Sequence, residues 1–170
     1  MRFRFFAVVK RSTLFLLLFL TFGLAKESAA QTRVFSGNAH YITDQVLHFA
    51  NNRIFPGYSF DFNEVLYTVI GNEIMLGGSG SEFDLVYTYR EGRIYTGNAM
   101  YSGQIVYTLG KNGKVYKGDS NFELDVLYTV KDAVIYAGSG AFAGDAIYFI
   151  EGRYSPADLF GILLSLDLIE

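Results

Sequence analysis

The stretch RIYTGNAMYSGQIVYTL, residues 93–109, contains features that return along the chain at a nearly fixed interval. Glycines recur 20 residues apart, with one spacing of 21, at Gly37, Gly57, Gly77, Gly97, Gly118 and Gly138. A valine or isoleucine stands three residues before each glycine. From the second unit on, a tyrosine stands ten residues after it. Such self-similarity indicates repeated units that complete a core only by stacking on their neighbours.

Each unit holds two short segments with the composition of strands. The first is of the type RIYTG and the second of the type QIVYTL, both rich in β-branched and aromatic residues. Dipeptides such as Asn112-Gly113 separate successive units and are typical of two-residue hairpin turns. The pattern therefore predicts six hairpin-like units, near residues 33–52, 53–72, 73–92, 93–113, 114–133 and 134–152.

The way these units close follows from the polarity of the strands. Both faces are fairly apolar, so the strands are expected to be covered on both sides. Radial closure achieves this and removes exposed sheet edges. The sequence thus predicts an all-β, radially closed array of six two-stranded repeats, either a propeller-like ring or a small barrel. A parallel β-solenoid with coils of about 20 residues is the alternative, and the hairpin dipeptides argue against it.

The chain closes with YSPADLFGILLSLDLIE, residues 154–170, which reads as a helix. Ser155 is a favoured N-cap, Pro156 suits the first helical position, and Asp158 suits the third. The segment is apolar on nearly every side, which indicates burial. We interpret residues 31–155 as the repeat domain and residues 156–170 as a capping helix that covers or plugs one opening of the array.

The arrangement resembles exported proteins built from short YxG-type hairpin repeats, including small radial folds described as β-flowers. The resemblance rests on the V/I-Y-x-G signature, on strands such as DVLYTV and on the C-terminal helix, and it covers about residues 33–168. It implies the radial fold. It implies no activity, no cofactor and no catalytic residue.

The N-terminal segment has the features of a secretory signal. Four positive charges in residues 1–11 precede the apolar run Leu14 to Ala25, which as a helix is about 18 Å long and too short to span a membrane. Small residues before Gln31 suit cleavage after Ala30, with cleavage after Ala25 as the alternative. We therefore expect residues 1–30 to be a signal peptide and the mature chain to be periplasmic or extracellular.

The charge of the mature chain limits its partners. Without residues 1–30 the chain keeps nine of its fourteen Lys and Arg and sixteen of its seventeen Asp and Glu, a net charge of −7. A chain of this sign without a basic patch is not expected to bind nucleic acid. It has no cysteine, so packing rather than disulfides must stabilise it. The oligomeric state is left open.

The predicted strands also bear on the membrane. They run five or six residues between turn signals, whereas a transmembrane barrel needs about 9 to 11 residues per strand. We therefore expect no membrane span in the mature chain.

An acidic or amide residue stands seven residues after each recurrent glycine. The set is Asp44, Glu64, Asp84, Gln104, Asp125 and Asp145. As a collar, such residues could hold a hard cation or act as acid and base. The favoured interpretation is that each carboxylate accepts hydrogen bonds within its own loop and starts the next strand. No metal and no cofactor is therefore expected.

The thirteen tyrosines divide into two groups. Those on the second strand, Tyr67, Tyr87, Tyr107, Tyr128 and Tyr148, are expected in the core. Tyr41, Tyr58 and Tyr101 lie in the variable loops, where exposure and recognition are more common. Phe122 and Phe142, at the place of Tyr41 and Tyr101, are interpreted as side chains that anchor their loops inward. The candidate ligand-binding residues are thus Tyr41, Tyr58, Tyr101, Asp84, Asp125 and Asp145.

Enzyme signals are nearly absent. The chain has no nucleophile elbow, no HExxH and no phosphate loop. His40 lies in a loop, and His48 is interpreted as a replacement of the recurrent tyrosine, one residue late. We therefore expect a non-enzymatic binding module for a glycan or an extracytoplasmic protein. A structural or envelope-interaction protein without a small ligand is the alternative, and a hydrolase that uses the repeat carboxylates ranks third.

Overall fold

The protein is described here by a computed structural model over residues 31–38 and 41–169. The predicted signal peptide, residues 1–30, and His40 lie outside these residues. Residues Gln31–Glu170 form one compact unit. Among the described residues, no helix has the length and apolarity that a membrane crossing requires.

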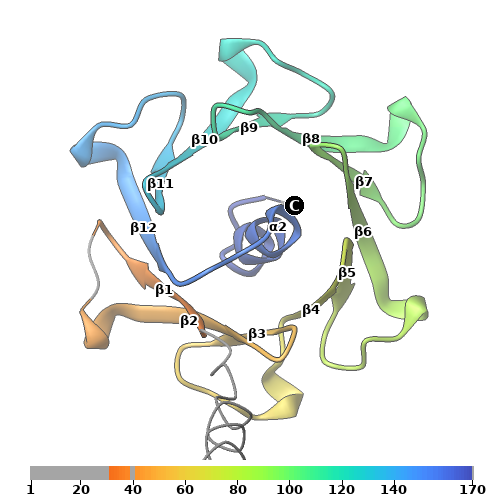
Figure 1. Cartoon of the computed structure of the whole chain (residues 1–170), viewed down its shortest axis with the longest axis vertical. Coiled ribbons are helices and arrows are strands. Elements are labelled where there is room, and N and C mark those ends of the chain that lie inside the picture. Colours follow the sequence, from red (N-terminus) through yellow and green to blue (C-terminus); the bar gives the residue numbers. More distant parts are fainter. Residues whose placement is uncertain (1–30, 39–40, 170) are drawn as a thin grey trace, which may run out of the picture. The chain divides into compact units, whose positions relative to one another are not determined.

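Within the described residues the chain forms twelve strands, two from each repeat. Their bounds are β1 Thr32–Ser36, β2 Gln45–Ala50, β3 Arg53–Pro56, β4 Tyr67–Ile70, β5 Glu73–Leu76, β6 Leu85–Arg90, β7 Arg93–Thr96, β8 Ile105–Leu109, β9 Lys114–Lys117, β10 Val126–Lys131, β11 Val134–Ala137 and β12 Ala146–Glu151. Each strand pairs with its two neighbours in sequence, and β1 pairs with β12, so the sheet closes into a barrel (Figure 1).

Every pairing in the barrel is antiparallel, which confirms the radially closed all-β fold. The solenoid alternative is wrong, because a parallel solenoid would place equivalent strands of successive units side by side. Closure leaves none of the twelve strands with an unpaired edge, as predicted for a radially closed array.

Tight turns join the second strand of each unit to the first strand of the next. Asn51 and Asn52 both have positive φ, as do Glu91 and Gly92, in keeping with two-residue hairpins that match the twist of the strands. The turn before β11 places Ala133 at φ 63°. This is a conformation that glycine adopts without strain and alanine does not.

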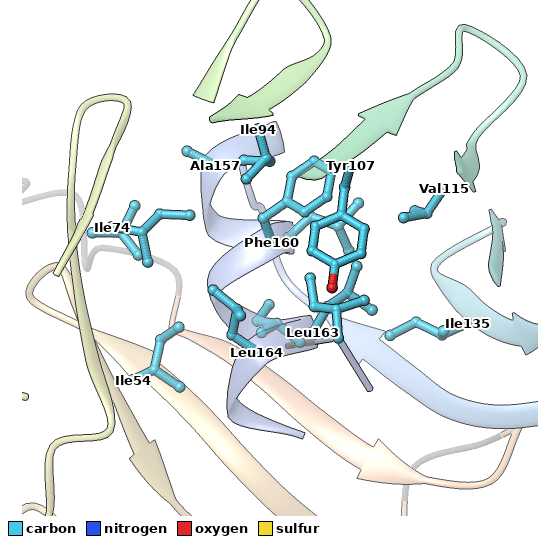
Figure 2. Packing of buried hydrophobic residues seen from close by; sticks show 14 of the residues in the cluster. Ile54, Ile74, Ile94, Tyr107, Val115, Ile135, Ala157, Phe160, Leu163 and Leu164 are labelled. Carbon is cyan, nitrogen blue, oxygen red and sulfur yellow. The ribbon is translucent and has the colours of Figure 1, made fainter. Parts of the chain in front are cut away.

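The core of the barrel is a ring of β-branched side chains around a helix. Helix α2, Pro156–Ser165, lies at the centre of the ring (Figure 1). One fully buried residue from the first strand of each unit faces it: Val34, Ile54, Ile74, Ile94, Val115 and Ile135. Figure 2 shows five of these around Phe160, Leu163 and Leu164 of the helix.

The start of α2 is fixed by the residues that the sequence singled out. The hydroxyl of Ser155 accepts a hydrogen bond from the backbone N–H of Asp158, and the Asp158 carboxylate accepts one from the N–H of Ser155, a reciprocal capping box. Seven of the ten helical residues are buried. The helix therefore fills the interior of the ring and is part of the core, rather than a lid over an opening.

Short 3₁₀ turns complete the described secondary structure. They are η1 Ile42–Asp44, η2 Phe62–Glu64, η3 Glu82–Asp84, η4 Ser102–Gln104, η5 Glu123–Asp125 and η6 Ala143–Asp145. One such turn precedes the second strand of every unit.

Candidate functional site

Six loops radiate from the ring, and we call them petals 1 to 6. They join the first strand of each unit to the second and span residues 37–44, 57–64, 77–84, 97–104, 118–125 and 138–145. Each petal ends in its 3₁₀ turn, which lies far from the helix at the outer edge of the molecule (Figure 1). The recurrent acidic or amide residue is the last residue of this turn, and in five of the six units the second strand begins at the next residue.

The petal carboxylates bond within their own loops. Asp84 accepts a hydrogen bond from the hydroxyl of Ser79, and Asp125 accepts one from the hydroxyl of Ser120. The Ser120 oxygen in turn accepts from the backbone N–H of Phe122, at 3.2 Å. These contacts agree with the interpretation of the acids as loop-folding residues, with a serine hydroxyl as the donor in place of a backbone N–H. Asp145 is exposed.

The acids do not gather into a metal site. Among the described residues, no group of three or more His, Asp or Glu side chains is placed to hold a metal ion. The six candidate ligand-binding residues instead belong to six different petals: Tyr41, Tyr58, Asp84, Tyr101, Asp125 and Asp145 lie in petals 1 to 6, in that order. The structure distributes them around the ring and does not bring them together in one cavity.

The three loop tyrosines point into solvent. Tyr41, Tyr58 and Tyr101 are 67%, 55% and 77% exposed. Tyr41 and Tyr101 directly precede the 3₁₀ turns of petals 1 and 4. Neither side chain caps its turn, so no local hydrogen bond of this kind accounts for its position.

The inward role expected for two phenylalanines is wrong. Phe122 and Phe142 occupy the position equivalent to Tyr101 in petals 5 and 6, but they are 70% and 73% exposed. The interior of the ring is already filled by α2. An aromatic ring at this position therefore faces water.

Other exposed apolar residues at the petals were missed by the sequence reasoning. Phe83 in petal 3 and Leu124 in petal 5 are 100% and 98% exposed, and both lie inside the 3₁₀ turn. Phe60 and Phe62 of petal 2 are also more than half exposed, and Met100 of petal 4 is half exposed. Together with the loop tyrosines, Phe122 and Phe142, these residues give every petal at least one exposed large apolar side chain. We call this set the apolar tips.

Arg53 joins one of the tips to the neighbouring petal. The guanidinium of Arg53 lies over the ring of Phe62, 5.1 Å from its centroid, and the Arg53 Nε donates to the carbonyl of Gly78 at 3.2 Å. Arg93 makes a similar bridge farther round the ring, to Asp119 of petal 5 at 2.8 Å. Basic residues at the start of the first strands thus fix the positions of adjacent petals.

The strand tyrosines belong to the core, as expected. Tyr107 is buried, and Tyr67, Tyr87, Tyr128 and Tyr148 are half-buried and pack against the helix cluster. The hydroxyl of Tyr128 donates to the carbonyl of Leu168 at 2.9 Å. Burial raises the pKa of Tyr128 and, with a smaller contribution from the charge of Asp167, that of Tyr67. These five residues, one from each of units 2 to 6, belong to or pack against the core cluster around α2.

His48 does not stand in for a tyrosine. Threonine follows the recurrent tyrosine in four units and donates to the glycine carbonyl nine or ten residues on, as Thr68 does to Gly77 at 2.7 Å. His48 Nδ1 makes the equivalent bond to Gly57 at 2.9 Å, and its ring stacks on Phe55. Leu47 takes the place of the tyrosine. The role of His48 is therefore to tie petal 2. Its buried Nε2 has no hydrogen-bond partner among the described residues.

Comparison with known proteins identifies the fold family. Searches of curated proteins and of solved structures gave no significant match. A family model described as "6-fold beta flower protein" does match, over residues 34–163. The match runs from the first strand into α2, and it agrees with the six hairpin units and the central helix found here. On this match, which covers well over half of the sequence, the chain belongs to the 6-fold beta flower protein family.

Proposed function

We propose that this chain is an exported, non-catalytic binding module that holds a protein partner outside the cytoplasm through its apolar tips. The observation that carries the proposal is the exposure of the tips. Phe83 and Leu124 are almost wholly in water, although each lies in a short, hydrogen-bonded 3₁₀ turn. Exposed apolar side chains on ordered loops are typical of interaction surfaces.

The chemistry of the tips favours a protein over a glycan. Phe83, Leu124 and Phe142 offer apolar area without a polar group, and such side chains supply anchors for pockets in a protein partner. A sugar ring would need hydroxyl or amide groups beside the aromatic face. The exposed tyrosines Tyr41 and Tyr101 provide such groups, so a glycan is the second candidate.

The radial arrangement adds a further reason. The apolar tips form six sets around the ring, one per petal, so that a partner with repeated sites or several partner copies could be held at once. Linked weak contacts strengthen one another because each later contact forms within a molecule that is already bound. Six modest patches are then sufficient for firm attachment.

Export and the absence of catalysis rest on separate support. The basic segment and apolar run before Gln31 have the order of a secretory signal. Asp84 and Asp125 are engaged by serines of their own petals, which favours folding roles over acid–base catalysis. Sequencing the N-terminus of the mature protein from the extracytoplasmic fraction tests export, with Gln31 as the expected first residue.

A crosslinking experiment tests the binding role. A photoreactive phenylalanine analogue is placed at position 83 or 124 in the organism that makes the protein, and adducts are identified by mass spectrometry. The matched control places the same analogue at Lys111, which is exposed in a hairpin turn away from the petals. We expect one recurring extracytoplasmic protein adduct from both tip positions and none from position 111.

Two further outcomes decide between the alternatives. Adducts to polysaccharide from the tips would replace the protein partner by a glycan. No adduct from the tips, or the same adducts from position 111, would contradict the binding module and favour a structural role. Replacing Tyr101 and Phe142 with serine should weaken a genuine adduct at position 83, because the tips act together.

A further inference from the structure

An open cavity lies at the end of the ring where α2 stops. Its volume is about 630 Å³, and its walls include Tyr67, Tyr87, Leu164, Asp167 and Ile169. The size is within the range of small-molecule sites. None of the apolar tips lines it, so any role of this cavity is independent of the proposed protein partner.

The segment after the helix is bonded to the ring at β10. The hydroxyl of Tyr128, on β10, holds the carbonyl of Leu168 at 2.9 Å. In the order of the twelve strands β10 lies opposite β4, the strand of Tyr67. Tyr67 therefore lines the cavity on the side of the ring opposite this bond, together with Tyr87 of the next unit.

The charge of the cavity has one sign. Asp167 is the only charged residue among the described residues that line it, and the last turn of α2 holds no basic residue. The C-terminal end of a helix carries a partial negative charge, which adds to that of the carboxylate. The rings of tyrosine present a negative face that attracts cations. Asp167 and Tyr67 line the same cavity, and burial, with a smaller contribution from the charge of Asp167, raises the pKa of Tyr67.

Aspartate is also unfavourable at position 167, just after the helix. It follows the helix at φ 52°, a position where glycine or asparagine is preferred. An acidic side chain at the negative end of a helix is unfavourable as well. A residue that breaks two local preferences at the edge of a cavity suggests a requirement other than stability.

We propose that this cavity binds a small organic cation, with its ammonium group beside the Asp167 carboxylate and against the faces of Tyr67 and Tyr87. A ligand with an amine or quaternary ammonium group and a few carbon atoms matches the volume, the apolar walls and the negative charge. Anions are opposed by the carboxylate and by the helix end.

An NMR titration of residues Gln31–Glu170 with choline tests the proposal. The neutral analogue 3,3-dimethyl-1-butanol has the same shape without the charge, and glucose serves as a neutral polyol. We expect choline, at concentrations up to about 10 mM, to shift the resonances of Tyr67, Tyr87 and Asp167 in a saturable manner. The neutral analogue should bind at least about fivefold more weakly, because it lacks attraction to both the carboxylate and the ring faces.

A matched pair of variants locates the site. Asp167→Asn removes the charge and keeps the shape, and asparagine accepts the positive φ. Asp132→Asn makes the same change at another exposed aspartate of φ 51°, in the turn before β11. We expect choline to bind about fivefold more weakly to Asp167→Asn and unchanged to Asp132→Asn.

Three results would overturn the proposal. These are no saturable shift at the cavity, equal affinity for choline and its neutral analogue, or equal affinity of the Asp167→Asn variant and the unchanged protein. A saturable response to glucose alone would assign the cavity to a neutral polyol instead. All of these readouts are independent of the petal residues, so they leave the crosslinking test of the apolar tips unaffected.

Discussion

The hydroxyl of Tyr128 and the carbonyl of Leu168, forty residues apart in sequence, are joined by a hydrogen bond of 2.9 Å. This bond links the ring to the chain that follows the central helix. Tyr128→Phe removes the donor and leaves the apolar ring in place. We expect a loss of about 1 kcal/mol in the free energy of unfolding, the usual net contribution of one hydrogen bond. Urea unfolding measures this change in the free energy of unfolding.

The control for that change is Tyr148→Phe, at the equivalent position of the next unit. Its side chain is half-buried in the same ring of tyrosines. The Tyr148 variant should lose clearly less stability than the Tyr128 variant. Equal losses would mean that the hydroxyls matter through general packing and that the bond to Leu168 does not stabilise the fold.

The stability of the fold at alkaline pH is expected to depend on three tyrosines. Burial raises the pKa of Tyr67, Tyr128 and Tyr154 above the ordinary value of 10.0, with the charge of Asp167 as a smaller cause at Tyr67. The folded state then holds these protons more tightly than the unfolded state. Their contribution to stability is fully present below pH 10 and is lost as the pH rises through the folded values. Thermal unfolding from about pH 8 to about pH 12 should show a fall confined to the alkaline end.

Tyr154→Phe isolates one of these contributions, since phenylalanine does not ionise. The variant should keep more of its neutral-pH stability above pH 10 than the unchanged protein does. If the two pH profiles are parallel, the buried phenol of Tyr154 has no part in the alkaline loss.

Gly161 allows α2 to approach the barrel wall. A Cβ atom there would stand 2.8 Å from Cδ1 of Ile54 and 2.9 Å from Cγ2 of Val69, both in the buried core. Overpacking of this kind costs about 1–3 kcal/mol, whereas alanine favours a helix over glycine by about 1 kcal/mol. We expect Gly161→Ala to lower the free energy of unfolding by on the order of 1 kcal/mol, and Gly161→Leu to lower it more.

Gly103 provides the comparison, because a Cβ atom at this petal position meets nothing within 4 Å. Gly103→Ala should leave stability nearly unchanged. Calorimetric unfolding of the three variants checks the order. A stabilised Gly161→Ala variant would show that the helix is less tightly enclosed than described here.

Ala133 is expected to be suboptimal at its turn. It has φ 63°, and the preceding Asp132 has φ 51°. Ala133→Gly relieves the strain of a Cβ atom in the left-handed region, and we expect it to raise the free energy of unfolding by about 1 kcal/mol. For a domain of this size the melting temperature should rise by roughly 4 °C. Ala137→Gly, within strand β11, should lower stability by about 0.5–1 kcal/mol, because glycine weakens strands.

Much of the fold could be predicted because its signals are local and repeated. The glycine and asparagine turns, the β-branched residues such as Ile74 and Ile94, and the cap at Ser155 each reflect a preference of a few adjacent residues. Repetition made them visible. The order of strands then followed from hairpins that can pair only with their neighbours.

The interpretation of His48 failed although a signal was present. Threonine follows the recurrent glycine by eleven residues at Thr68, and His48 follows Gly37 by the same eleven. His48 therefore occupies the position of the threonine, whose side chain binds a glycine carbonyl, and not the position of the tyrosine. Histidine resembles tyrosine in being aromatic, but here its ring nitrogen makes the hydrogen bond that the threonine hydroxyl makes in other units.

The apolar tips lacked any such signal. Phe122 and Phe83 lie in segments of three or four residues without periodicity, so the sequence cannot tell whether their rings point inward. Their direction depends on the assembled ring, in which no element of residues 31–38 and 41–169 forms a second layer outside the barrel. The cavity beside Asp167 is equally hidden, because it depends on which side of the ring holds Leu168.

Replacing Asp167 is expected to raise the stability of the fold and to weaken binding of a cation in the cavity. Replacing it with glycine relieves a positive φ of 52° and removes a negative charge from the negative end of α2. We expect the free energy of unfolding to rise by about 1 kcal/mol at low salt, with the electrostatic part of the gain, about 0.3–1 kcal/mol, shrinking as salt is added. Asp132→Gly, which relieves φ 51° in a hairpin turn without a helix end, should show a gain that depends less on salt. Urea unfolding at low and high sodium chloride separates the two contributions. A gain at position 167 that matches position 132 at every salt concentration would mean that the helix end carries no effective charge at this cavity, which would also weaken the case for a cationic ligand there.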